Sequence, residues 1–117
     1  MTTQEVAYRL IELSRHGQIM QAQEELYGND IVSIEPSHAP VPVAKGKQAV
    51  NEKGMQFASS ILEHHGMSIS EPIVVGNRFS IGWTMDVTMK DMGRVNFDEI
   101  CVYEVKDGKI VNEQFFY

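Results

Sequence analysis

A run of strict two-residue alternation between positions 79 and 89 most constrains the fold. Apolar residues occupy every odd position of this run and include Trp83, the only tryptophan of the chain. The even positions carry small or polar residues. Such a period predicts a β-strand with one buried face. We therefore expect that helices cover this face directly, or that the face lines a pocket roofed by the helices.

Three further strands are predicted around this one. Alternating or apolar runs indicate strands over residues 67–75, 94–105 and 109–117. The connecting turns are predicted at Gly76-Asn77, Asp91-Met92-Gly93 and Lys106-Asp107-Gly108. Glycine, asparagine and aspartate tolerate the backbone of tight turns. The last two strands are apolar on both faces, so we expect one face to contact the core and the other to contact a partner chain.

The first half of the chain is predicted to be mainly helical. Apolar residues recur every three or four positions, which predicts helices over residues 3–15, 19–26 and 47–63. His64-His65-Gly66 is expected to end the third helix. An apolar strand over 31–34 follows the second helix, and a loop containing Pro36, Pro40 and Pro42 leads to Gly46.

The order of these elements, αα-β-α-ββββ, indicates an α+β domain. All the helices precede a long antiparallel meander, so we expect a strongly curved antiparallel sheet folded around the helices as a cone-shaped barrel with one open end. No repeat, linker or low-complexity segment interrupts the sequence. Residues 1–117 are therefore expected to form a single domain.

Charge and composition exclude several classes of function. The net charge is −6, with no basic run, so nucleic acid and anionic membranes are not expected partners. The chain has neither a signal-like start nor a long apolar window, which predicts a soluble, cytoplasmic protein. Cys101 is the only cysteine, so no disulfide can form within the chain. No metal-ligand spacing is present, and no metal site is predicted.

Glu35 is the first candidate for a functional residue. It ends the apolar strand and precedes Pro36, which biases Glu35 toward an extended backbone and supplies no donor to continue a ladder. One interpretation is a solvated carboxylate at a strand end. The other is a carboxylate at the rim of an apolar cavity, where loss of water makes it a usable base.

The sequence resembles the nuclear transport factor 2-like superfamily, and within it the SnoaL-like polyketide cyclases and ketosteroid isomerases. The resemblance rests on the element order, Gly17, the segment 25–36 (ELYGNDIVSIEP), Gly46 and the closing segment 105–111 (VKDGKIV). It implies a cystatin-like cone with a hydrophobic pocket inside. It also implies a homodimer packed through the sheet and no metal or organic cofactor.

The resemblance also implies roles for individual residues. Glu35 falls on the proton-shuttling carboxylate of the isomerases, and Tyr27 falls on a pocket-lining aromatic position. A tyrosine at a helix end with its hydroxyl in water is the other interpretation of Tyr27. The isomerases carry an oxyanion-binding tyrosine near the position of Leu10. This chain has no tyrosine at that position. Tyr8 is two residues away and is expected to lie on another side of the helix.

The second acid of the isomerases maps near Asp98-Glu99, where the register is open. A type I turn with a glycine bulge at Lys106-Asp107-Gly108 would pair Val105 with Lys109, and would place Glu99 opposite Phe115 and Cys101 opposite Glu113. A two-residue type I′ turn would instead turn Asp98 and Ile100 inward. We favour Glu99, because Phe97, Cys101 and Tyr103 share its face.

These residues suggest a reaction and an alternative to it. Glu35 would remove a proton next to a carbonyl, while protonated Glu99, Tyr27 or Tyr117 stabilises the oxyanion, so that isomerisation, dehydration or cyclisation follows. The alternative is a ligand-binding or dimeric interaction module that catalyses nothing.

His38 could pair with Glu35 at the cavity mouth or lie in water. Glu113 could face the pocket or a dimer contact. The predicted ligand-binding residues are Tyr27, Phe57, Trp83, Met85, Cys101, Glu113, Phe115 and Tyr117.

Overall fold

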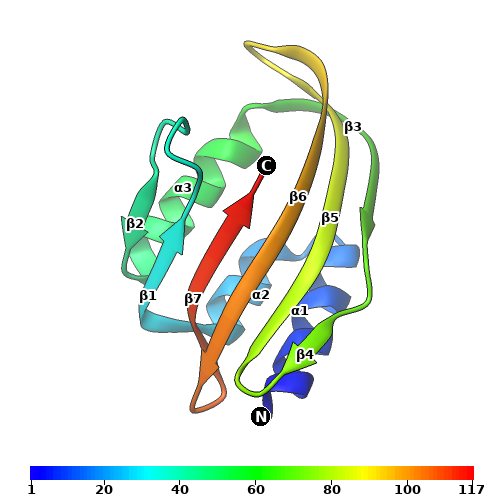
Figure 1. Cartoon of the computed structure of the whole chain (residues 1–117). Helices are drawn as coiled ribbons and strands as arrows, with labels where there is room; N and C mark the ends of the chain where they lie inside the picture. The colour runs from blue at the N-terminus through cyan, green and yellow to red at the C-terminus, as the bar shows by residue number, and fades with distance from the viewer.

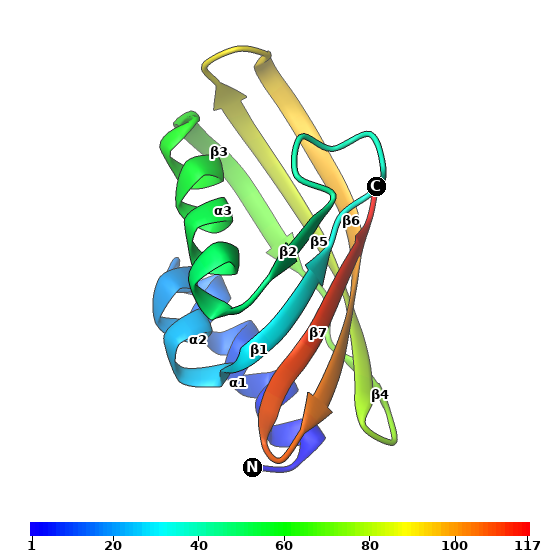
Figure 2. The ribbon, with the colours of Figure 1, turned by 90° about the vertical axis from the view of Figure 1, so that its left-hand side faces the viewer.

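Seven strands form one mixed sheet, and three helices cover one of its faces (Figures 1 and 2). The computed structural model describes all residues, 1–117. Its elements are α1 (Thr3–Arg15), α2 (Ile19–Leu26), β1 (Tyr27–Ile34), β2 (Val43–Lys45), α3 (Lys47–Ser59), β3 (Ile61–Ile69), β4 (Ile73–Val75), β5 (Arg78–Met89), β6 (Gly93–Lys106) and β7 (Lys109–Phe116). The predicted α+β class is confirmed. None of the helices is long and apolar enough to cross a membrane.

The strand order is β2-β1-β7-β6-β5-β3, and β4 pairs with the start of β5. All pairings are antiparallel except that of β1 with β7, which is parallel. The prediction of a purely antiparallel sheet is corrected at this point. A parallel pair needs a long crossover connection, and here the chain from β2 to β6 supplies it. This pairing brings the end of the chain beside the strand that leads to Glu35.

Helix α1 starts at a capping box. The Thr2 hydroxyl accepts a hydrogen bond from the Glu5 amide at 3.1 Å, and the Thr2 amide donates to the Glu5 carboxylate at 2.8 Å. These bonds satisfy donors that the first turn of a helix leaves free. The helix then buries an apolar face against the sheet, which includes Val6, Ala7, Leu10 and Ile11.

The predicted end of the third helix is wrong. Helix α3 ends at Ser59, and the segment from Ile61 through His64-His65-Gly66 belongs to β3. Ile61 continues the helical spacing of apolar residues, which extended the prediction. Its partner, however, is Met89 of β5, and it packs with the buried Met85, Val87 and Met89. Strand pairing here outweighs local periodicity.

The loop after β1 is more ordered than predicted. Its last residues form the short strand β2, which pairs with β1, and the Glu35 amide donates to the Pro42 carbonyl at 2.7 Å. This bond returns the proline-containing loop to the end of β1. Figure 2 shows the C-terminus beside the same loop. Glu35, the loop that carries His38 and the C-terminal Tyr117 therefore share one end of the sheet.

The turn between β6 and β7 has two residues, Asp107 and Gly108, both with positive φ (52° and 75°). The favoured three-residue turn and its register are therefore wrong, since Lys106 pairs with Lys109. Val111 nevertheless bulges out of register between the next two pairs. Cys101 then lies opposite Phe115, and Tyr103 lies opposite Glu113. The bulge therefore brings Glu113 and Phe115 of β7 onto the inward side of the sheet, beside Tyr103 and Cys101 of β6.

Candidate functional site

Glu113 is a buried carboxylate at the centre of a group of polar side chains. Strand β7 presents it to the interior, where it is 2% exposed. The Tyr27 hydroxyl donates a hydrogen bond to its Oε1, and the Ser33 hydroxyl donates to its Oε2 at 2.7 Å. Burial raises the pKa of Glu113, although these hydrogen bonds act against the rise. Of the two predicted placements of Glu113, the inward one is correct, and the Tyr27 hydroxyl is buried beside it.

Lys53 of α3 connects Glu113 to Glu35. Its Nζ donates to the Ser33 hydroxyl at 2.5 Å and to Oε1 of Glu35 at 3.2 Å. The Lys53 and Glu35 side chains are only 18% and 16% exposed. The Lys53 Nζ also lies 5.4 Å from the ring centroid of Phe115, within the range of a cation–π interaction. A continuous polar chain thus runs from Glu35 at the end of β1 to Tyr27 in the core.

Sequence reasoning missed Lys53. The signal that could have found it is its position three residues after the buried Val50 and four residues before Phe57, which places all three on one side of a helix. A lysine on the apolar side of a helix needs a partner, because burial of an unpaired charge is costly. Glu35 is the partner that the structure supplies.

Glu99 is partly buried on the inward face of β6, on the same side as Cys101 and Tyr103. Burial and the negative charge of Glu35 raise the pKa of Glu99 to about 7, against the opposing effect of Lys53. Near neutral pH, therefore, Glu99 can exist as a hydrogen-bond donor or as an acceptor. Asp98 is exposed on the opposite face.

The remaining predicted residues surround this chain at different depths. Tyr117 packs edge-on against His38, with ring centroids 5.8 Å apart, and His38 is exposed. Burial and the Glu35 carboxylate raise the pKa of the Tyr117 hydroxyl. The structure thus places His38 against Tyr117 and pairs Glu35 with Lys53. Cys101 is buried in the main core, where loss of water raises the pKa of its thiol.

Phe57 and Met85 are both neighbours of Phe97 on β6. Phe57 is 38% exposed and packs edge-on against Phe97 at 5.5 Å between centroids. Met85 belongs to the small cluster formed with Val87 and Met89. Trp83 packs against both this cluster and the main core. Met85 and Trp83 thus belong to the apolar interior, whereas Phe57 is exposed.

Two buried polar atoms near these residues have no hydrogen-bond partner in the protein. One is Oε2 of Glu35, whose other oxygen is held by Lys53. The other is Nε1 of Trp83, a residue that lies directly opposite Glu99 in the sheet. Unpaired buried groups are uncommon and costly in folded proteins. A ligand could donate a hydrogen bond to Oε2 of Glu35 and accept one from Nε1 of Trp83.

The comparison with known proteins shows the family and agrees with the fold. Residues 1–117 match a family described as SnoaL-like domain. This chain belongs to the SnoaL-like family. Within the nuclear transport factor 2-like superfamily, a crystal structure from Mesorhizobium loti, provisionally named a SnoaL-like polyketide cyclase, is 38% identical to this chain. It covers 100% of both chains with a TM-score of 0.94. No curated protein sequence matches this SnoaL-like domain.

More distant structures share the fold alone. A protein of unknown function with a cystatin-like fold from Xanthomonas campestris has a TM-score of 0.83 at 16% identity. It covers 99% of this chain and 90% of its own. A protein with a ketosteroid isomerase-like fold from Catenulispora acidiphila, crystallised with trimethylamine, has a TM-score of 0.75 at 15% identity. The match covers 97% of this chain and 85% of the Catenulispora acidiphila chain.

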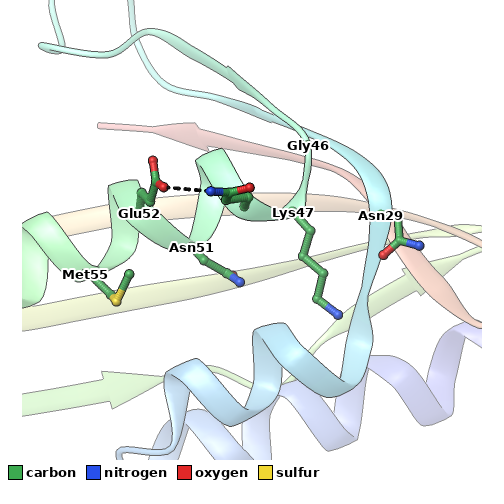
Figure 3. A pocket seen from close by; sticks show the side chains of 7 residues that line it. Asn29, Gly46, Lys47, Asn51, Glu52 and Met55 are labelled. Carbon is green, nitrogen blue, oxygen red and sulfur yellow. Dashed lines mark hydrogen bonds between the residues drawn. The ribbon is translucent and has the colours of Figure 1, made fainter.

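A surface hollow of about 680 Å³ lies elsewhere on the SnoaL-like domain, on the outer side of α3 (Figure 3). Met55 is the one hydrophobic residue of its lining. Lys47 spans toward α2, where its Nζ donates to the Glu24 carbonyl at 2.7 Å. No predicted site residue lines this hollow. Its polar, open character is unlike that of an apolar ligand site.

The raised pKa of Glu99 predicts a pH dependence of stability. Between its ordinary value of 4.5 and about 7, the folded protein retains a proton at Glu99 that the unfolded chain releases. Stability from this group is fully present below pH 4.5 and is lost as the pH rises through about 7. Glu99→Gln is therefore expected to reduce the fall in stability over this range, as measured by urea unfolding at successive pH values. Glu104→Gln, on the opposite face of β6, should retain the fall; equal slopes in both variants would contradict the assignment.

Proposed function

We propose that this SnoaL-like domain is a proton-transfer enzyme, an isomerase, dehydratase or cyclase, for a small and largely apolar carbonyl compound. Glu35 is the general base. The observation that carries the proposal is the state of the Glu35 carboxylate: Lys53 holds Oε1, while Oε2 is buried and has no partner. A base positioned by one oxygen, with the other free for substrate, is suited to proton abstraction.

The neighbouring groups support the subsequent steps. When Oε2 of Glu35 removes a proton from the carbon next to the carbonyl, negative charge develops on the carbonyl oxygen. Protonated Glu99 can donate to that oxygen below its pKa of about 7. Return of the proton to another carbon completes an isomerisation. Alternatively, attack of the enolate carbon on a second carbonyl closes a ring, and the proton held by Glu35 passes to the alkoxide that this forms.

Sequence similarity supports the same class of reaction. The Mesorhizobium loti structure, 38% identical over its whole length, carries the provisional name of polyketide cyclase. Polyketides are chains of carbonyl compounds with acidic carbons between the carbonyl groups. The chemistry of Glu35 proposed here would act on such carbons.

A ligand-binding module without catalysis is the second candidate function. It is favoured by Leu10, which is 3% exposed and occupies the core where the isomerases place an oxyanion-binding tyrosine. Tyr8 is exposed and lies outside the core. Under this alternative, the same residues hold a carbonyl ligand without moving a proton.

The two functions differ in proton exchange. A β,γ-unsaturated ketone, 3-cyclohexenone, can report both isomerisation, by ultraviolet absorbance, and exchange of its acidic protons in deuterium oxide, by NMR. We expect the wild-type chain to accelerate both. Saturable binding of the ketone with no acceleration of either process would instead support the ligand-binding module.

We also propose that the domain forms a homodimer through the outer face of the sheet. Apolar side chains are exposed there: Ile100 and Phe116 lie opposite each other on β6 and β7, 58% and 48% exposed. All the helices lie on the other side of the sheet (Figure 2). Exposed apolar patches of this kind are typical of interaction surfaces.

Analytical ultracentrifugation tests the dimer. Ile100→Lys is expected to shift the wild-type dimer to monomer, since a charge on an apolar interface remains without a partner. Met92→Lys, at the exposed β5–β6 turn, is the control and should leave the dimer intact. A monomeric wild-type chain, or a dimer unaffected by Ile100→Lys, would refute this interface.

A further inference from the structure

We propose that the Lys53 ammonium group is a second oxyanion-binding donor of this site, in addition to Glu99. The substrate is then a carbonyl compound whose oxygen contacts Lys53 while its adjacent acidic carbon contacts Glu35. This inference rests on the proposed function and names the class of compound that the site accepts. It assigns a direct role in the reaction to a residue that the sequence did not single out.

The first support is the hydrogen bonding of Lys53. An ammonium group has three donors, and the protein uses two of them, toward the Ser33 hydroxyl at 2.5 Å and Oε1 of Glu35 at 3.2 Å. One N–H therefore has no acceptor in the protein. The face of the Phe115 ring, 5.4 Å from Nζ, gives the ammonium group an apolar boundary.

The second support is the closeness of this free donor to the free acceptor, Oε2 of Glu35. Both belong to the same ion pair, so they can contact neighbouring atoms of one small molecule. The oxygen and the acidic carbon of a carbonyl compound are separated by two bonds, of about 1.2 and about 1.5 Å. A molecule of this geometry can accept from Lys53 and present its acidic proton to Glu35 together.

The third support is the charge of the surroundings. Glu35, Glu99 and Glu113 are the acids of the site, and Lys53 is a cation that is paired with Glu35. Its charge acts on both Glu99 and Glu113, because it opposes the rise in pKa of each. A cation in a poorly hydrated interior stabilises developing negative charge more strongly than it would in water. Lys53 of α3 can thus bind the oxyanion in place of the tyrosine of the isomerases, whose position on α1 is occupied here by the buried Leu10.

The step balances without an oxidant or a reductant. The C–H bond next to the carbonyl breaks, its proton goes to Oε2 of Glu35, and the electron pair forms a carbon–carbon double bond. The electrons of the carbonyl double bond move to the oxygen, where Lys53 donates a hydrogen bond. Return of a proton to carbon restores the carbonyl and regenerates the Glu35 carboxylate.

Binding of 4-nitrophenol tests the role of Lys53 without any turnover. Its phenolate form absorbs visible light and imitates the oxygen of an enolate. At a pH below the pKa of free 4-nitrophenol, we expect the wild-type chain to bind the phenolate form and to increase its absorbance. Lys53→Met is expected to weaken phenolate binding by about 10- to 100-fold, the effect of one charged hydrogen bond.

Two further variants control for folding and for general charge. Lys53→Gln keeps neutral N–H donors for Ser33 and Glu35, so it should fold if Lys53→Met does not, and it should still weaken phenolate binding about tenfold or more. Lys90→Met removes the same charge from an exposed position and should bind as the wild type does. Phenolate binding that is equal in wild type and Lys53→Gln, or absent from the wild type, would overturn the inference.

Glu35→Gln separates this inference from the proposed function. It should slow isomerisation of 3-cyclohexenone by about 10²- to 10⁴-fold and retain phenolate binding, because Lys53 remains. Retained isomerisation would refute Glu35 as the base and leave the phenolate result to decide the role of Lys53. Loss of phenolate binding in Lys53→Gln alone, with isomerisation unchanged, would refute the catalytic role of Lys53 and leave Glu35 as the base.

Discussion

Glu35→Gln is expected to slow the isomerisation of 3-cyclohexenone by about 10²- to 10⁴-fold, the usual contribution of a general base. The amide keeps the shape of the side chain and can still accept a hydrogen bond from Lys53, but it cannot take up a proton at neutral pH. The measurement is the initial rate of enone formation, compared at the same protein concentration. Far-ultraviolet circular dichroism should show an unchanged fold.

Glu52→Gln is the matched control for this variant. Glu52 is exposed on α3 and accepts a hydrogen bond from the Gln48 amide at 3.3 Å. The amide oxygen of a glutamine at position 52 can accept the same bond. Its rate should equal that of the wild type. A Glu35→Gln variant that retains most of the wild-type rate would exclude Glu35 as the base of the reaction.

Phe79→Ala is expected to lower the free energy of unfolding by about 3–5 kcal/mol, the range for loss of a buried aromatic side chain. Phe79 is 2% exposed and stacks on Tyr103, with ring centroids 4.8 Å apart and an angle of 19° between the rings. Its removal leaves a cavity beside a second large buried ring. The measurement is urea unfolding at one fixed protein concentration, because the proposed dimer would make stability depend on concentration.

Val75→Ala provides the contrast. Val75 is 74% exposed at the end of β4, so its truncation should change stability by no more than about 0.5 kcal/mol. Since domains of this kind are stable by about 5–15 kcal/mol, Phe79→Ala can approach complete unfolding. A loss below about 1 kcal/mol would mean that Phe79 does not pack as described.

The fold could be predicted from the sequence wherever local pattern and tertiary packing agree. The alternation from Phe79 to Met89 coincides with β5, and the spacing of Val6 and Leu10 coincides with α1. Disagreement arose where a residue satisfied two patterns. Ile61 fits the apolar spacing of α3 but pairs with β5. The parallel pairing of β1 with β7 leaves no mark in either strand, because pairing depends on a distant partner.

The candidate site could be predicted only in part for the same reason. Pro36 marked Glu35, and the apolar neighbours of Glu99 indicated its inward face. The turn that was expected to set the register of β6 and β7 is not the one that forms, and it is the bulge at Val111 that brings Glu113 of β7 to the inward side. Lys53 has no local signal beyond its position on one helical turn with Val50. Its role follows from contact with β1, which helical periodicity alone does not reveal.

The pairing of β1 with β7 determines when the site can form. The hydrogen bond between Ser33 and Glu113 joins residues 80 positions apart, and that between Tyr27 and Glu113 joins residues 86 positions apart. During synthesis, β1 is complete long before β7 exists, so Ser33 and Tyr27 must wait for nearly the whole chain before their acceptor arrives. Contacts of such long range form slowly. A chain interrupted before β7 would contain Glu35 and Lys53 but would lack the buried carboxylate to which they are connected.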